Sequence, residues 1–143
     1  MGDLKSKVQR TVDVLNDGNI GLIDELYGRT FFNRSTPSGV APTRDGYKLS
    51  VMALRTAFPD LHYTLDDVIE SGDKVVTRVT ASGTMRGSIA GVPPTGKQAT
   101  WTEMHIMRFA DECVVEHWGL VDQLDMMVQL DVIAAPGRVP TAV

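Results

Sequence analysis

Residues 100–124 read TWTEMHIMRFADECVVEHWGLVDQL, and this stretch decides the fold. Apolar and polar residues alternate on both sides of Asp111-Glu112, which predicts two antiparallel strands joined by a two-residue turn. A glutamate as the second turn residue is unusual, because a type I′ turn needs a positive φ there. The functional prediction therefore depends on which side chains of this hairpin face a cavity.

With a two-residue turn, His105 lies opposite Trp118 and Trp101 lies opposite Asp122, all on the face that would line a cavity. His117 then points to the other face. Because His117 and Trp118 are neighbours in one strand, one of the two faces away from the cavity. A β-bulge in the second strand, near Gly119, would rotate which of them does so.

The rest of the chain has helical spacing first and strand spacing afterwards. From Leu61 onward apolar residues recur at every second position, which predicts strands at about residues 62–69, 74–85, 98–109 and 114–121. Before and after them, helices are expected at about 4–16, 20–27, 44–57 and 123–133. This order predicts one α+β domain over residues 1–135, with helices on the concave side of a curved antiparallel sheet and a C-terminal tail at 136–143.

Composition excludes several classes of protein. The chain has 143 residues, a net charge of −4 and one cysteine, Cys113. A basic run is absent, so nucleic acid is not an expected partner. A lone cysteine fits a reducing compartment, and no apolar run reaches the length of a membrane span, so we expect a soluble, cytoplasmic protein. The three histidines have no metal-binding spacing, and no glycine-rich nucleotide motif occurs, so neither a metal nor a nucleotide cofactor is predicted.

Five segments together resemble one known family: AFPDLHYTLDDV (57–68), GDKVVTRVTASGTMRG (72–87), GVPPTGKQ (91–98), EMHIMRF (103–109) and VVEHWGLVDQL (114–124). They are similar to the SnoaL-like polyketide cyclases, which belong to the nuclear transport factor 2-like superfamily. The resemblance covers about residues 4–133. It implies a cone-shaped α+β fold, a hydrophobic pocket between sheet and helices, no cofactor, and a homo-oligomer (dimer or tetramer).

The resemblance also implies a reaction, an intramolecular aldol ring closure on an aromatic polyketide ester. His105 matches a histidine that lines the pocket in this family. The position of the family's catalytic aspartate is occupied here by Gly119, which carries no carboxylate. A departure at this position leaves open a different cofactor-free reaction, such as isomerisation, hydrolysis or oxygenation, and also ligand binding without catalysis.

Two residues are candidates for acid–base catalysis, His105 and Asp122. A buried carboxylate has a raised pKa and can act as both acid and base, and imidazole can donate or accept a proton. Each has a structural alternative: Asp122 precedes the last helix and could cap it, and His105 could be a structural residue of the sheet. Glu103 and Glu116 could replace the missing acid but are expected in solvent or at a sheet edge.

Six further residues are expected to contact a small hydrophobic, polyketide-like substrate. Asn33 and Tyr47 could form hydrogen bonds to it, although loop or core packing is the simpler role for both. The aromatic and sulfur-containing side chains could instead belong to the core. The predicted substrate-binding residues are Asn33, Tyr47, Met52, Trp101, His117 and Trp118.

Overall fold

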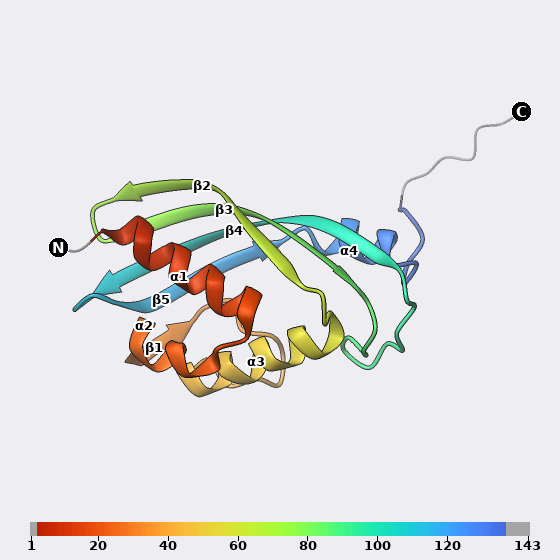
Figure 1. The fold of residues 1–143 in the computed structure, drawn as a ribbon, viewed down its shortest axis with the longest axis horizontal. Helices are drawn as coiled ribbons and strands as arrows, with labels where there is room; N and C mark the ends of the chain where they lie inside the picture. Colours follow the sequence, from red (N-terminus) through yellow and green to blue (C-terminus); the bar gives the residue numbers. More distant parts are fainter. Residues whose placement is uncertain (1–2, 137–143) are drawn as a thin grey trace, which may run out of the picture.

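The computed structural model describes residues 3–136 as five helical segments and one five-stranded sheet (Figure 1). All but the first residue of the predicted tail lies outside the described residues. The elements in chain order are α1 (Leu4–Asp17), η1 (Ile20–Leu22), α2 (Ile23–Leu26), β1 (Tyr27–Asn33), α3 (Arg44–Ala57), β2 (His62–Ser71), β3 (Lys74–Thr84), β4 (Gln98–Ala110), β5 (Cys113–Val121) and α4 (Gln123–Gln129).

Local sequence explains where the two long helices begin and end. Asp3 caps α1 by accepting a hydrogen bond from the backbone N–H of Lys5 at 3.0 Å, and Gly18 ends the helix with a φ of 74°. Thr43 caps α3 through the N–H of Gly46 at 3.2 Å. The predicted bounds of both helices are confirmed to within about one residue.

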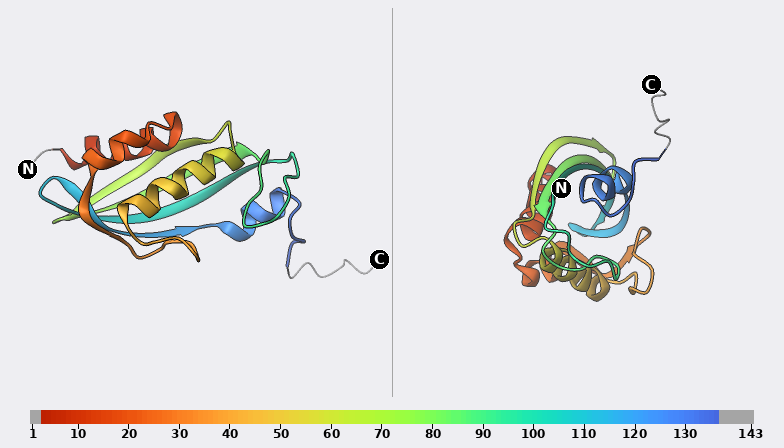
Figure 2. Two further views of the ribbon diagram at one scale, coloured as in Figure 1. Left: turned by 90° about the horizontal axis from the view of Figure 1, so that it is seen from below. Right: turned by 90° about the vertical axis from the view of Figure 1, so that its right-hand side faces the viewer.

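The sheet has the strand order β1-β5-β4-β3-β2 and is antiparallel except for the parallel pair β1 and β5. It curls strongly, and α1 and α3 lie on its concave side (Figure 2). The α+β fold predicted from the sequence is therefore confirmed. Strand β1 was not predicted: the second helix ends at Leu26, and Tyr27 already pairs with Val114 of β5.

The β4–β5 hairpin turns at Asp111 and Glu112, which have φ values of 50° and 66°. Ala110 pairs with Cys113 and Phe109 with Val114, as predicted, but Arg108 pairs with Glu116. Val115 is thus the extra residue of a β-bulge, and every later pairing shifts by one residue.

His105 therefore lies opposite Gly119, and the predicted pairing with Trp118 is wrong. A shift of one residue also exchanges the two faces of β5. His117 turns toward the concave side of the sheet, while Trp118 faces outward with Ile106. The bulge comes earlier in the strand than the position near Gly119 that the sequence suggested.

Side-chain amides cover two free stretches of sheet edge. Asn16 of α1 accepts from the backbone N–H of Tyr63 at 2.6 Å and donates to its carbonyl at 2.9 Å. Gln129 does the same for Thr100 of β4, at 2.9 Å and 2.8 Å. Helix α4 ends at this glutamine, four residues earlier than predicted. No helix in residues 3–136 is long and apolar enough to cross a membrane.

Candidate functional site

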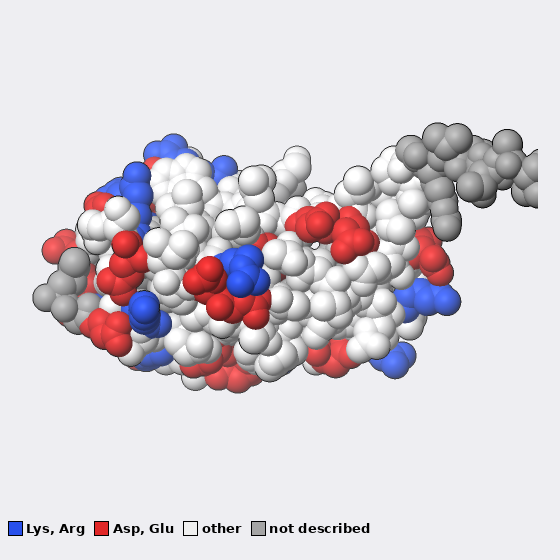
Figure 3. All heavy atoms as spheres, turned by 90° about the horizontal axis from the view of Figure 1, so that it is seen from above, with Lys and Arg blue, Asp and Glu red and all other residues white. Residues whose placement is uncertain are grey.

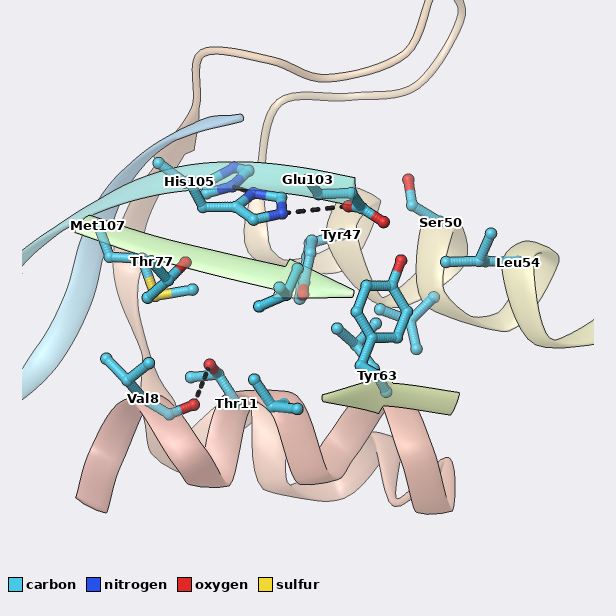
Figure 4. A pocket seen from close by; sticks show the side chains of 15 residues that line it. Val8, Thr11, Tyr47, Ser50, Leu54, Tyr63, Thr77, Glu103, His105 and Met107 are labelled. Carbon is cyan, nitrogen blue, oxygen red and sulfur yellow. Dashed lines mark hydrogen bonds and ion pairs between the residues drawn. The ribbon is translucent and has the colours of Figure 1, made fainter. Parts of the chain in front are cut away.

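A cavity of about 140 Å³ lies between the two long helices and the concave face of the sheet (Figure 4). Helices α1 and α3 supply most of its apolar wall, and strands β2 to β5 supply most of its polar groups. Its lining residues are Val8, Thr11, Val12, Leu15, Tyr47, Ser50, Val51, Leu54, Tyr63, Thr77, Val79, Glu103, His105, Met107 and His117.

A chain of hydrogen bonds runs along one wall of this cavity. The Trp101 indole N–H donates to Glu103 Oε2 at 2.9 Å, and Glu103 Oε1 lies 3.1 Å from His105 Nε2. His105 Nδ1 lies 2.8 Å from His117 Nε2, and His117 Nδ1 lies 2.8 Å from Asn33 Oδ1. Residues from β1, β4 and β5 thus form one continuous polar network beside an apolar space.

The protonation of His117 follows from its neighbours. Asn33 Oδ1 accepts from the backbone N–H of Ser35 at 3.0 Å, which fixes that atom as the amide oxygen. His117 Nδ1 therefore carries a proton and donates to Asn33. Burial, together with nearby His105, lowers the pKa of His117 to about 3, so the ring is neutral near pH 7. Its Nε2 must then accept a hydrogen bond from His105 Nδ1.

With Nδ1 of His105 committed to donating, its remaining nitrogen, Nε2, faces Glu103 Oε1. This contact needs one proton, which lies either on His105 as an imidazolium or on Glu103 as a carboxylic acid. Glu103 is 5% exposed, so the carboxyl group is removed from water. The network therefore contains a single mobile proton, shared by Glu103 and His105 at the edge of the cavity.

Two tyrosines, Tyr47 and Tyr63, add phenol groups to the wall. Burial, and then the neighbouring Glu103 carboxylate, raises the pKa of Tyr63 well above its usual range. Burial likewise raises the pKa of Tyr47. Both phenols therefore keep their protons near neutral pH and can act as hydrogen-bond donors to a ligand.

Gly119 makes room for the histidine pair. A Cβ atom at this position would lie 2.6 Å from His105 Nδ1 and 3.0 Å from Cε1 of His117, too close for any side chain. The two rings stack with their centres 5.0 Å apart. The volume that an aspartate would need at this position is thus occupied by the contact between His105 and His117.

Five of the eight predicted site residues come together here. His105, His117 and Tyr47 line the cavity. Asn33 is buried and holds His117, and Trp101 is buried behind the cavity with its N–H on Glu103. The sequence left open whether His117 or Trp118 faces the cavity, and the bulge at Val115 turns His117 inward.

The other three predicted residues do not reach the cavity. Asp122 is exposed and caps α4 by accepting from the N–H of Asp125 at 3.3 Å. Met52 is 52% exposed on the outer side of α3. Trp118 lies on the convex face of the sheet, where Lys74 approaches its ring at 5.6 Å. None of the three is among the residues that line the cavity.

Glu103 was expected in solvent or at an edge, and this expectation is wrong. The signal that could have placed it was the alternation along β4, in which Trp101, Glu103, His105 and Met107 share one face. Glu116 does lie away from the cavity, where it pairs with Arg34 at 2.7 Å and with Arg108 at 2.9 Å. Tyr63 and Thr77 were also missed as cavity residues.

One face of the molecule carries charged groups of both signs. On the face drawn in Figure 3, basic atoms are interspersed with acidic ones and form no continuous basic patch. Within residues 3–136, no group of three or more histidine, cysteine or acidic side chains is arranged to hold a metal ion. The expectation that the protein does not bind nucleic acid stays a prediction.

The curled sheet with helices over its concave face defines the α+β architecture of the nuclear transport factor 2-like class. The sequence profile of the SnoaL-like polyketide cyclases matches residues 5–130. Because this match spans nearly the whole chain, the protein belongs to that family. No curated protein matches the sequence with statistical significance.

Solved structures of similar fold support this assignment. TsrD from Streptomyces laurentii has a TM-score of 0.84 and 25% identity, over 91% of this chain and 96% of TsrD. IdmH from Streptomyces antibioticus, a candidate polyketide cyclase, has a TM-score of 0.80 and 27% identity, over 91% of this chain and 99% of IdmH. AclR from Streptomyces galilaeus, a candidate hydroxylase, has a TM-score of 0.79 and 28% identity, over 96% of this chain and 84% of AclR.

Proposed function

We propose that this protein catalyses proton transfer at a carbon next to a carbonyl group, in a small hydrophobic substrate and without a cofactor. The buried Glu103–His105 pair, with its single mobile proton beside an apolar cavity, is the observation that carries the proposal. Proton removal next to a carbonyl is the first step of an aldol ring closure, and the family is described as polyketide cyclases. We therefore favour a cyclase-type reaction.

The contacts support specific roles. With the proton on His105, the Glu103 carboxylate accepts a proton from the substrate carbon, and the electron pair of the broken C–H bond moves onto the carbonyl oxygen. The His105 imidazolium and the Tyr63 hydroxyl lie beside Glu103 and stabilise the negative charge that develops. In a ring closure the enolate carbon attacks a second carbonyl, a C–C bond forms, and the resulting alkoxide takes the proton back from Glu103.

In this proposal the catalytic carboxylate belongs to Glu103, whereas the family's catalytic aspartate lies at the position that Gly119 occupies here. Gly119 cannot supply an acid, and the exposed Asp122 does not face the cavity. Glu103 is buried beside Trp101, and a carboxylate that first removes a proton and later returns it acts as both base and acid. Isomerisation would begin with the same proton removal and is the alternative that this site also supports.

Deuterium exchange tests the proton-transfer step without knowledge of the natural substrate. The protein is incubated in D₂O with acetophenone, 2-acetonaphthone and an anthraquinone-type polyketide methyl ester, and deuterium at the carbon next to the carbonyl is measured by mass spectrometry. We expect exchange above background with at least one compound. Glu103→Gln and His105→Gln should each lower its rate about 100-fold or more, because each removes a member of the acid–base pair.

Asp122→Asn is the matched control, because it neutralises a carboxylate outside the cavity, and its exchange rate should equal that of the wild type. Circular dichroism and thermal unfolding would show that all variants fold. The proposal is contradicted if compounds that bind show no exchange, or if Glu103→Gln exchanges as fast as the wild type.

A further inference from the structure

We propose that the substrate is an uncharged carbonyl compound, that the part of it enclosed by the protein is the size of one ring, and that the Thr77 hydroxyl binds its oxygen. This inference rests on the proposed proton transfer and narrows the class of molecule on which it acts. Three independent features of the cavity carry it: its volume, the charge of its lining, and a hydroxyl group that faces the cavity and has no partner among the described residues.

The volume sets the size of the enclosed part. The cavity measures about 140 Å³. An engineered protein cavity of about 150 Å³, lined by apolar side chains, binds benzene. One six-membered ring with a short substituent therefore fits between α1, α3 and the sheet. A fused system of three or four rings does not fit in this space unless the helices move away from the sheet.

The lining determines the charge of the ligand. No lysine or arginine is present among the residues of the described chain that line the cavity. An anionic ligand would therefore lie beside the Glu103–His105 pair without a cation of its own to compensate it. Removing an ionised carboxylate from water without such a partner is strongly unfavourable. A neutral ketone or ester has no such cost, and the apolar wall favours its ring.

Thr77 is the group that can hold the carbonyl oxygen. Its side chain is 2% exposed and projects into the cavity from β3, where Thr77 pairs directly with His105 (Figure 4). Among the described residues its hydroxyl makes no hydrogen bond, whereas the hydroxyl groups of Thr11 and Ser50 donate to backbone carbonyls at 2.7 Å and 3.2 Å. No fully buried side-chain polar atom in the described residues lacks a partner, so the Thr77 hydroxyl is accessible from the cavity and is free to donate to a ligand oxygen there.

The test compares ligands that differ in one property each. Acetophenone is the uncharged one-ring ketone; α-methylstyrene has the same shape without the oxygen; benzoate adds a charge; and 1-acetylpyrene adds three rings. Dissociation constants are measured by ligand-observed NMR for the wild type, Thr77→Val and Thr77→Ser. Thr102→Val, on the exposed face of β4, is the matched control for a threonine-to-valine change.

We expect acetophenone to bind at least tenfold more tightly than benzoate or 1-acetylpyrene. Thr77→Val should weaken acetophenone binding about fivefold, the effect of one net hydrogen bond, and should leave α-methylstyrene binding unchanged. Thr77→Ser should restore most of the affinity, and Thr102→Val should change nothing. A purely structural role for Thr77 would instead alter the binding of both ligands.

The inference is overturned if acetophenone does not bind, if Thr77→Val binds it like the wild type, or if benzoate or 1-acetylpyrene binds equally well. Its failure differs visibly from failure of the proposed function. Acetophenone that binds as predicted but never exchanges its protons contradicts the proton transfer and supports the ligand class. Exchange confined to the larger ketones contradicts the ligand class and supports the proton transfer.

Discussion

At the scale of single residues, one missing side chain explains the arrangement of the site. Because Gly119 has no Cβ, the rings of His105 and His117 can meet across β4 and β5 at 2.8 Å. The Gly119 N–H donates to Ser35 Oγ at 2.8 Å, which joins β5 to the loop after Asn33. Glycine in place of the family's aspartate therefore accompanies a different polar network, and the His105–His117 contact fills the space that the missing side chain would occupy.

His117 should make stability depend on pH. Above its ordinary pKa of 6.5, it is neutral in both the folded and the unfolded chain. Between 6.5 and about 3 the unfolded chain binds a proton at His117 and the folded protein does not. The free energy of unfolding should therefore fall with decreasing pH in this window, by up to about 1.4 kcal/mol per unit from this group.

Urea unfolding of wild type and His117→Gln at pH 7, 6, 5 and 4 measures this contribution. Glutamine offers one donor and one acceptor but does not titrate, so its free energy of unfolding should fall less steeply as the pH decreases. Equal slopes for the two proteins would show that His117 is not held neutral by burial.

The sequence identified part of the site at this scale. His105 could be recognised from the motif EMHIMRF, and the alternation along residues 101–107 contained the information that buries Glu103. The inward position of His117 could not be derived from alternation, because a bulge at Val115 changes its phase. The partner that orients His117, Asn33, lies on β1, 84 positions away in the sequence.

At the scale of elements, two side-chain amides hold helices on the sheet: Asn16 joins α1 to β2, and Gln129 joins α4 to β4. Asn16 satisfies both backbone groups of Tyr63, a cavity residue, and so couples the end of α1 to β2. Asn16→Ala should lower the free energy of unfolding by about 1–3 kcal/mol, because it leaves partly buried backbone groups unpaired. Gln9→Ala, which removes an exposed amide of the same helix, should change it by less than about 0.5 kcal/mol.

Chemical denaturation of the two variants beside the wild type gives these values. Equal stability of Asn16→Ala and the wild type would mean that water replaces the two Asn16 hydrogen bonds to Tyr63 without loss of stability.

Most elements could be predicted because their signals are local. Strand periodicity between residues 61 and 121 and the caps of α1 and α3 lie within a few residues of the structures that they specify. Strand β1 was missed because its strand partner within residues 3–136 is β5, roughly 80–90 residues later, and the preceding helical spacing continued through Tyr27. Such a parallel pairing leaves no local turn signal.

At the scale of the whole molecule, the sheet has two apolar faces, of which the helices cover one. The convex face presents Met104, Ile106, Trp118 and Leu120, and Leu120 is 80% exposed. Large exposed apolar patches mark interaction surfaces, and a twofold contact would bury the same patch on each copy. The homo-oligomer expected from the family therefore remains a prediction, with this face as its proposed interface.

Sedimentation velocity of the wild type, Leu120→Lys and Leu49→Lys tests whether the convex face is a dimer interface. Leu49 is a matched exposed leucine on α3, 63% exposed. We expect a dimer that Leu120→Lys converts to monomer and that Leu49→Lys leaves intact. A wild type that is monomeric at all concentrations, or a dimer that is unaffected by Leu120→Lys, contradicts the interface.

The central claim is that Asn33 fixes the proton of His117 and thereby leaves one mobile proton between Glu103 and His105. Imidazole ¹⁵N NMR of the labelled protein from pH 8 to 5, with signals assigned through histidine-to-glutamine variants, measures this directly. We expect His117 to be a neutral ring protonated on Nδ1 throughout, with His105 also protonated on Nδ1. A His117 ring protonated on Nε2, or one that becomes charged within this range, would contradict the account.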